Sequence, residues 1–173
     1  MILPILQDPD PVLYTVSEPV IDFDNKISVL ITDMIETCKM TDNCVGLAAI
    51  QVNMPLRISV IKLGKKYIHI INPEIVYASG IMSAEWEGCM SAGEKDDQLF
   101  SKVRRDTKIT VKYQDKQGRY MTRQCNGFVA HAFQHEIDHM NGILFLSHVQ
   151  DKKNLWKDKD LNTYLEKHNK LPL

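Results

Sequence analysis

The sequence predicts an α+β domain in which mostly antiparallel strands surround a central helix, with a further helix toward each end of the chain. Three observations predict this fold class. Apolar residues recur at helical spacing in segments 24–40 and 128–140. Between these segments, short alternating or apolar runs are divided by Pro and Gly, as in β-strands. Two such runs, 107–114 and 119–125, flank a short loop containing Gly118, which is typical of a hairpin.

The amino-terminal part of the chain is expected to form an arm followed by a helix. Residues 1–23 are rich in proline and lack a steady period, so we expect an extended arm that lies on the domain. The first helix is expected over 24–40, because Ile27, Leu30, Ile31 and Met34 fall on one face and Asp24 or Asn25 can cap it. We interpret this helix as scaffold.

The middle of the chain is expected to be strands. Proline and glycine turns divide it into the runs 47–52, 56–63, 66–73 and 74–80, and the hairpin 107–125 follows. Asn126-Gly127 ends the hairpin, and a second helix is expected over 128–140 before Gly142 stops it. A short terminal helix is expected over 160–168.

Composition limits the classes of function. A chain of 173 residues is long enough for one buried core, so we expect a single domain over 1–173. Apolar residues make up 44%, charged residues 25%, and the net charge is -1. This balance argues against sequence-specific nucleic acid binding and against a membrane surface as partner. No apolar run approaches the roughly 20 residues that span a bilayer.

The start of the chain and the cysteines indicate a compartment. The first 20 residues lack the basic start and unbroken apolar stretch of a signal peptide, and their acidic residues do not fit a transit peptide. We therefore expect a cytoplasmic protein. The four cysteines form no CxxC pair and are expected to be mainly free thiols, with one available as a metal ligand: Cys38, Cys44, Cys89 and Cys125.

The segment QHEIDHMNG, residues 134–142, carries the main chemical signal. In a helix, His135 and His139 share one face about 6 Å apart and can converge on a metal ion. Glu136 lies one position round the helix, where it can reach a water without being a ligand. His131 does not complete the site, because its rise of about 12 Å from His139 exceeds the about 4 Å that separates two nitrogens on one metal. A ligand from another segment is needed, and Cys89 in WEGCMS is the best candidate, since a thiolate binds Zn or Fe(II) strongly.

Three segments together resemble the signatures of peptide deformylases, which remove the formyl group from the N-terminal methionine of new proteins. They are CVGLAAIQ at 44–51, EGCMS at 87–91 and QHEIDHMNG at 134–142, in the family's order and at its separations. The resemblance implies that Cys89, His135 and His139 hold one divalent metal ion. It implies Fe(II) as the native metal, with Zn or Ni as alternatives, and a water in the open fourth position.

The resemblance also implies the remaining roles. Glu136 acts as general base and later as proton donor, while the Gln51 amide and the Met90 backbone N–H stabilise the oxyanion. Val45 and Gly46 pair with the substrate backbone, and Glu87 and Arg105 belong to the substrate-binding set, with Arg104 as an alternative to Arg105. The expected partners are N-formylmethionyl peptides, met at the ribosome.

The sequence departs from the family pattern at several positions. Cys44 replaces the first glycine of its signature, and Ala92-Gly93 stands where proline is usual, so we expect a looser loop at one wall of the substrate pocket. Two other functions stay open. One is a zinc peptidase that takes His148 as its third ligand, and the other is a non-catalytic metal-binding relative.

Overall fold

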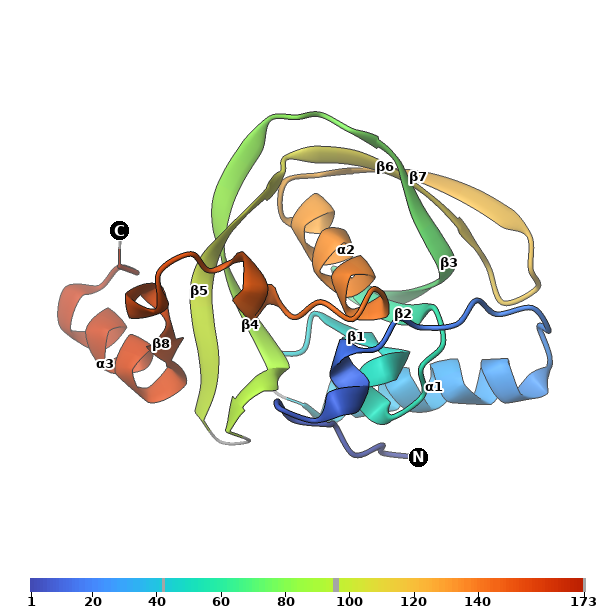
Figure 1. Cartoon of the computed structure of the whole chain (residues 1–173), viewed down its shortest axis with the longest axis horizontal. Coiled ribbons are helices and arrows are strands. Elements are labelled where there is room, and N and C mark those ends of the chain that lie inside the picture. The colour runs from blue at the N-terminus through green and yellow to red at the C-terminus, as the bar shows by residue number, and fades with distance from the viewer. Residues whose placement is uncertain (42, 95–96, 173) are drawn as a thin grey trace.

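The computed structural model describes residues 1–41, 43–94 and 97–172, and it confirms the α+β class. Two antiparallel sheets enclose a helix (Figure 1). The larger sheet has the order β1-β2-β3-β6-β7, formed by Gly46–Ala48, Ile58–Leu63, Lys66–Ala78, Lys108–Gln114 and Tyr120–Asn126. The smaller sheet has the order β4-β5-β8, formed by Met82–Glu94, Asp97–Asp106 and Trp156–Lys157.

Helix α2 (Gly127–Met140) lies inside the arch formed by these strands (Figure 1). Its buried residues Phe133, Ile137 and Met140 belong to the same apolar cluster as Ile70 and Val111 of the larger sheet. The helix ends as expected. Gly142 has a φ of 72°, and a Cβ at this position would lie 2.6 Å from the Tyr14 carbonyl oxygen. The left-handed conformation and the close approach of the arm both require glycine there.

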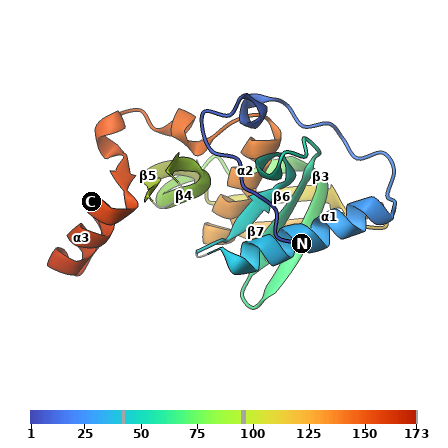
Figure 2. The same cartoon turned by 90° about the horizontal axis from the view of Figure 1, so that it is seen from below.

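Helix α1 (Asn25–Met40) covers the opposite side of the larger sheet, where Ile27, Ile31 and Met34 are buried. The side chain of Asp24 caps it by accepting hydrogen bonds from the backbone N–H groups of Lys26 and Ile27. Helix α3 (Asp158–His168) lies beyond β5, at the end of the molecule farthest from α1 (Figure 2). Among the described residues, no helix has the length and apolar character needed to cross a membrane.

The amino-terminal arm is extended except for one 3-10 turn at Pro11–Tyr14. It runs behind two segments that the sequence assigns to the site. The Leu6 N–H donates to the Gln51 carbonyl at 2.8 Å, and the Asp8 N–H donates to the Ser91 carbonyl at 2.8 Å. The arm therefore holds these segments in place.

Some sequence-based expectations for the strands were wrong. Ala49–Val52 forms a 3-10 turn rather than the end of a strand, and its Ala49, Ile50 and Val52 side chains are buried. Pro73 does not divide two strands, because β3 continues past it with an irregular register between Ile71 and Glu74. Ala92-Gly93 is no loose loop, since it belongs to β4 and Gly93 pairs with Gln98 of β5.

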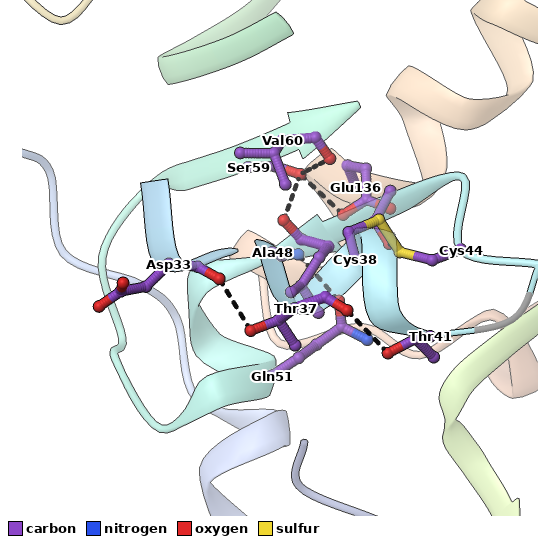
Figure 3. The surroundings of a disulfide bond; sticks show 12 residues. Asp33, Thr37, Cys38, Thr41, Cys44, Ala48, Gln51, Ser59, Val60 and Glu136 are labelled. Atoms are coloured by element: carbon purple, nitrogen blue, oxygen red, sulfur yellow. Dashed lines mark hydrogen bonds between the residues drawn. A yellow bond between two sulfur atoms is a disulfide. The ribbon is translucent and has the colours of Figure 1, made fainter. Parts of the chain in front are cut away.

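The expectation of free thiols was wrong for two of the four cysteines. A disulfide joins Cys38 in the last turn of α1 to Cys44, just before β1 (Figure 3). Both side chains are buried, and their Cα atoms lie 5.3 Å apart. Sequence spacing does not reveal this pair, because it depends on the end of α1 lying close to the residue that precedes β1. Cys89 and Cys125 are free and buried.

Candidate metal centre and active site

The two histidines of α2 converge as their spacing predicts. The Nε2 atoms of His135 and His139 lie 3.2 Å apart. The His139 side chain is buried, and that of His135 is partly buried. Cys89 of β4 approaches from the smaller sheet, with its Sγ 3.3 Å from His139 Nε2. The three potential ligand atoms all lie within 4.8 Å of one another. The structure therefore brings together the thiol and the two imidazoles named from the sequence, whereas His131 lies outside this cluster.

Local strand geometry presents the thiol. The pairing of β4 with β5 is irregular between Gly88 and Gly93, and Cys89 lies in this interval. The Ser91 N–H lies 3.4 Å from the Cys89 sulfur, and Gln51 Nε2 lies 3.6 Å from it. The thiolate is the form of cysteine that binds a metal. A thiolate and two neutral imidazoles form a donor set that suits Zn or Fe(II), so these residues fit a divalent metal ion.

The Glu87 carboxylate connects His135 to buried side chains that surround the site. Its carboxylate accepts hydrogen bonds from Arg105 and lies 2.9 Å from His135 Nδ1 and 2.7 Å from His131 Nε2. Burial alone would raise the pKa of Glu87, but hydrogen bonds from His131, His135 and Arg105 outweigh it and hold the pKa well below its usual value. A carboxylate on the second nitrogen of a ligating histidine fixes the ring's tautomer and orientation.

The assignment of Arg105 to the substrate is corrected by this geometry. Arg105 is only 5% exposed and does not line the cavity beside the histidines. Its guanidinium binds Glu87 and also Asp138 of α2 at 2.7 Å, so its donors are engaged within the protein. Glu87 does line the cavity, but its carboxylate is occupied by these partners. Both side chains support the histidines rather than present free groups to a peptide.

Glu136 lies beside the cluster with its carboxylate buried. Ser59 of β2 donates a hydrogen bond to Glu136 Oε2 at 2.8 Å, and burial raises the pKa of Glu136 to about 7. Gly46 of β1 lies against the other oxygen, because a Cβ on Gly46 would come within 2.2 Å of Glu136 Oε1. A carboxylate that is poised near neutral pH suits a group that accepts and returns a proton.

The sequence did not identify Ser59 as a partner of Glu136. The only signal was a hydroxyl in a mostly apolar strand run, and this signal is too weak to assign a role. Its role becomes visible only when β2 and α2 are placed together, since Ser59 and Glu136 are far apart in the chain.

Gln51 is held on both ends of its side-chain amide. Its Oε1 accepts the Ala48 N–H at 2.9 Å, which leaves Nε2 directed toward Ser91 Oγ at 3.0 Å and the Cys89 sulfur. Met90 follows Cys89 directly and is anchored by its carbonyl, which accepts a hydrogen bond from Gln7 at 2.8 Å. Gln51 and Met90 both line the cavity.

A cavity of about 340 Å³ opens onto these groups. Val45 and Gly46 form one side of it, next to β1. Among the described strands, β1 pairs only with β2, and the Val45 carbonyl accepts the Lys62 N–H of β2 at 2.7 Å. The other edge of β1 is therefore open, and an extended peptide can add to such an edge through main-chain hydrogen bonds.

The structure does not support the peptidase alternative. His148 would be the third ligand of a His-Glu-x-x-His peptidase, but its Nε2 binds Asp138 Oδ2 at 2.8 Å. It is not part of the cluster formed by Cys89, His135 and His139. The Cys89 thiol, and not His148, lies beside the two histidines.

Comparisons with known proteins agree with this geometry. Residues 2–155 match the family model described as polypeptide deformylase. The peptide deformylase of Campylobacter jejuni is 36% identical over 98% of this chain and 99% of its own length. The crystal structure of peptide deformylase from Thermotoga maritima superposes with a TM-score of 0.82 at 36% identity, covering 87% of this chain and 99% of that one. A deformylase from Acinetobacter baumannii, solved with Met-Ala-Ser bound, gives a TM-score of 0.79 at 29% identity, covering 86% of this chain and 99% of that one.

Proposed function

This chain belongs to the polypeptide deformylase family, and we propose that Cys89, His135 and His139 hold its single metal ion. The protein is a hydrolase that removes the formyl group from N-formylmethionyl peptides. The observation that carries the ligand assignment is the convergence of one thiol and two imidazoles beside the buried carboxylate of Glu136. Fe(II) is the native metal in this proposal, with Zn or Ni as substitutes.

Each remaining residue has one task in the proposed reaction. When bound, a divalent metal in such a site polarises the formyl group and activates water for attack at neutral pH. Glu136 accepts the proton of the attacking water and later gives it to the departing amine. Gln51 Nε2 and the Met90 N–H donate hydrogen bonds to the oxygen on which negative charge develops, each worth about 3 to 4 kcal/mol.

The substrate is proposed to lie along the open edge of β1. Val45 and Gly46 line the cavity and offer main-chain groups to an extended peptide. Formyl peptides of new proteins would be met at the ribosome, in the cytoplasm. A disulfide is unusual in that reducing compartment. Trapping the thiols of Cys38 and Cys44 with an alkylating reagent at cell lysis tests this location, since a fully oxidised pair would contradict it.

Formate release from formyl-Met-Ala-Ser tests the role of Glu136. Glu136→Gln keeps the shape of the side chain and should lower kcat about 100- to 10,000-fold with the metal retained. Glu85→Gln, an exposed carboxylate of β4, is the matched control and should leave the rate unchanged. Equal rates for Glu136→Gln and the wild type would remove Glu136 as base.

Metal analysis tests the ligands independently of turnover. Protein purified without oxygen should contain one Fe(II) per chain, and Cys89→Ala should lose it. Cys125→Ala is the matched control, because Cys125 is also a free buried thiol but lies in the apolar cluster of the larger sheet. Full metal content in Cys89→Ala would refute the ligand assignment. Metal content without formate release in the wild type would favour the non-catalytic relative.

We also infer that residues 1–173 fold as one domain. The arm binds the segments of Gln51 and Ser91, and β8 pairs with β5, so both ends of the described chain pack on the same body. Calorimetry should then give a single transition.

A further inference from the structure

The active-site cavity continues well past the proposed metal ligands. Along α2 it is lined by His135, then by Ala132 and Phe128, which lie successively closer to the start of the helix. Seven residues of helix separate Phe128 from His135, a rise of about 10 Å. That distance exceeds the reach of an extended methionine side chain, so such a side chain can be accommodated along it. In the proposed binding of the substrate, the side chain of the formylated residue can extend into this part of the cavity.

Two residues of the carboxy-terminal segment also line this cavity. Leu161 of α3 and Leu171 beyond it are the contributors. Leu161 is the buried residue of α3 and is only 7% exposed, while Leu171 is 41% exposed. Both lie outside residues 2–155, which the polypeptide deformylase model matches.

The carboxy-terminal segment is fixed to the sheet that carries Cys89. Strand β8 pairs with β5, with Trp156 opposite Phe100. The N–H of Lys159 donates to Asp97 Oδ1 at 3.3 Å, and the Trp156 ring packs edge-on against Tyr164 with centroids 5.3 Å apart. These contacts hold α3 at one place on the sheet (Figures 1 and 2).

Phe100 connects this attachment to the active site. Its ring also lines the cavity, and it lies so close to Gly88 that a Cβ on Gly88 would come within 2.3 Å of it. The residue after Gly88 is Cys89. The wall made by the carboxy-terminal segment is therefore built on the same pair of strands as the thiol.

We propose that Leu161 and Leu171 are specificity-determining residues that contact the side chain of the formylated residue and limit the length and bulk it can have. This inference rests on the proposed binding of the substrate in this cavity. The selected ligand class is an unbranched apolar side chain such as methionine. Larger aromatic side chains are disfavoured because these two leucines occupy the space they would need.

Comparing the rates of two substrates tests the proposal. Rates of formate release are measured for formyl-Met-Ala-Ser and formyl-Phe-Ala-Ser with the full-length holoenzyme. Leu161→Ala and Leu171→Ala should each raise KM for the methionine peptide about tenfold with little change in kcat. The preference for Met over Phe, as a ratio of kcat/KM values, should fall about tenfold. Leu165→Ala is the matched control, because Leu165 is on α3, is partly exposed and does not line the cavity.

These measurements distinguish a lost specificity role from a folding defect and from a failure of the proposed chemistry. A folding defect in Leu161→Ala would lower both rates together and leave the ratio unchanged, and Leu171→Ala, at a more exposed position, repeats the test. An unchanged ratio in both variants would overturn the proposal. If Glu136→Gln abolishes formate release while the leucine variants behave as wild type, the specificity role alone is refuted. If Glu136→Gln has no effect, the proposed chemistry of the site fails instead.

Discussion

Replacing Gly46 by alanine should disable Glu136, the proposed base, without touching a proposed metal ligand. The new Cβ would lie 2.2 Å from Glu136 Oε1 and 2.7 Å from its carboxyl carbon, whereas ordinary contacts begin near 3.4 Å. The carboxylate must therefore move by about 1 Å, and a displacement of this size typically lowers a rate about 100-fold. That loss corresponds to about 2.7 kcal/mol of transition-state stabilisation.

The assay is kcat for formate release, with metal content measured on the same sample. Gly46→Ala should retain its metal and lose about 100-fold in kcat. Gly46 also borders the proposed peptide edge, so a double-mutant cycle is needed to isolate the effect on Glu136. In the Glu136→Gln background, Gly46→Ala should have little further effect on kcat. Losses that multiply in the double variant, or a single variant with wild-type kcat, would refute the reasoning.

Three further predictions concern the supports of the site. Ser59→Ala removes a hydrogen-bond donor from the Glu136 carboxylate, so the pKa of Glu136 should rise further. The acid limb of the pH profile of kcat/KM should then move to higher pH, and an unmoved limb would contradict this. Arg105→Leu leaves Glu87 buried without its guanidinium and should lower the free energy of unfolding by about 3 to 5 kcal/mol in denaturant titrations, whereas a loss under 1 kcal/mol would show that the ion pair is dispensable. Cys38→Ala opens the short disulfide loop and should destabilise the protein by about 2 kcal/mol, and a reductant should then have no additional effect on this variant.

Sequence patterns predicted the parts of this molecule that depend on local chemistry. The capped helix α1, the hairpin of β6 and β7, and α2 with its two histidines follow from periodicity and turn residues. The pairing of Cys89 with those histidines came from motif resemblance, and the structure brings the three atoms together. No periodicity would have placed a lone thiol of β4 against α2.

Contacts between distant segments explain what sequence reasoning missed. The Cys38–Cys44 bridge depends on how the end of α1 is placed against the residue that precedes β1. Arg105 was assigned to the peptide by resemblance, and its partners Glu87 and Asp138 could not be foreseen because they lie on other elements. The 3-10 turn at Ala49–Val52 reads as a strand by composition, since burial on all sides produces the same apolar run.

The Glu87 carboxylate has a consequence for how the molecule moves. It joins β4, β5 and α2 through Arg105, His131 and His135, and Arg105 returns to α2 through Asp138. Any partial opening that lifts α2 from the smaller sheet would strip a buried anion of its partners, which is expensive in a poorly solvated interior. The amides of α2 should therefore exchange with deuterium only when the whole molecule unfolds. The helix that holds two of the proposed ligands belongs to the last part of the protein to open.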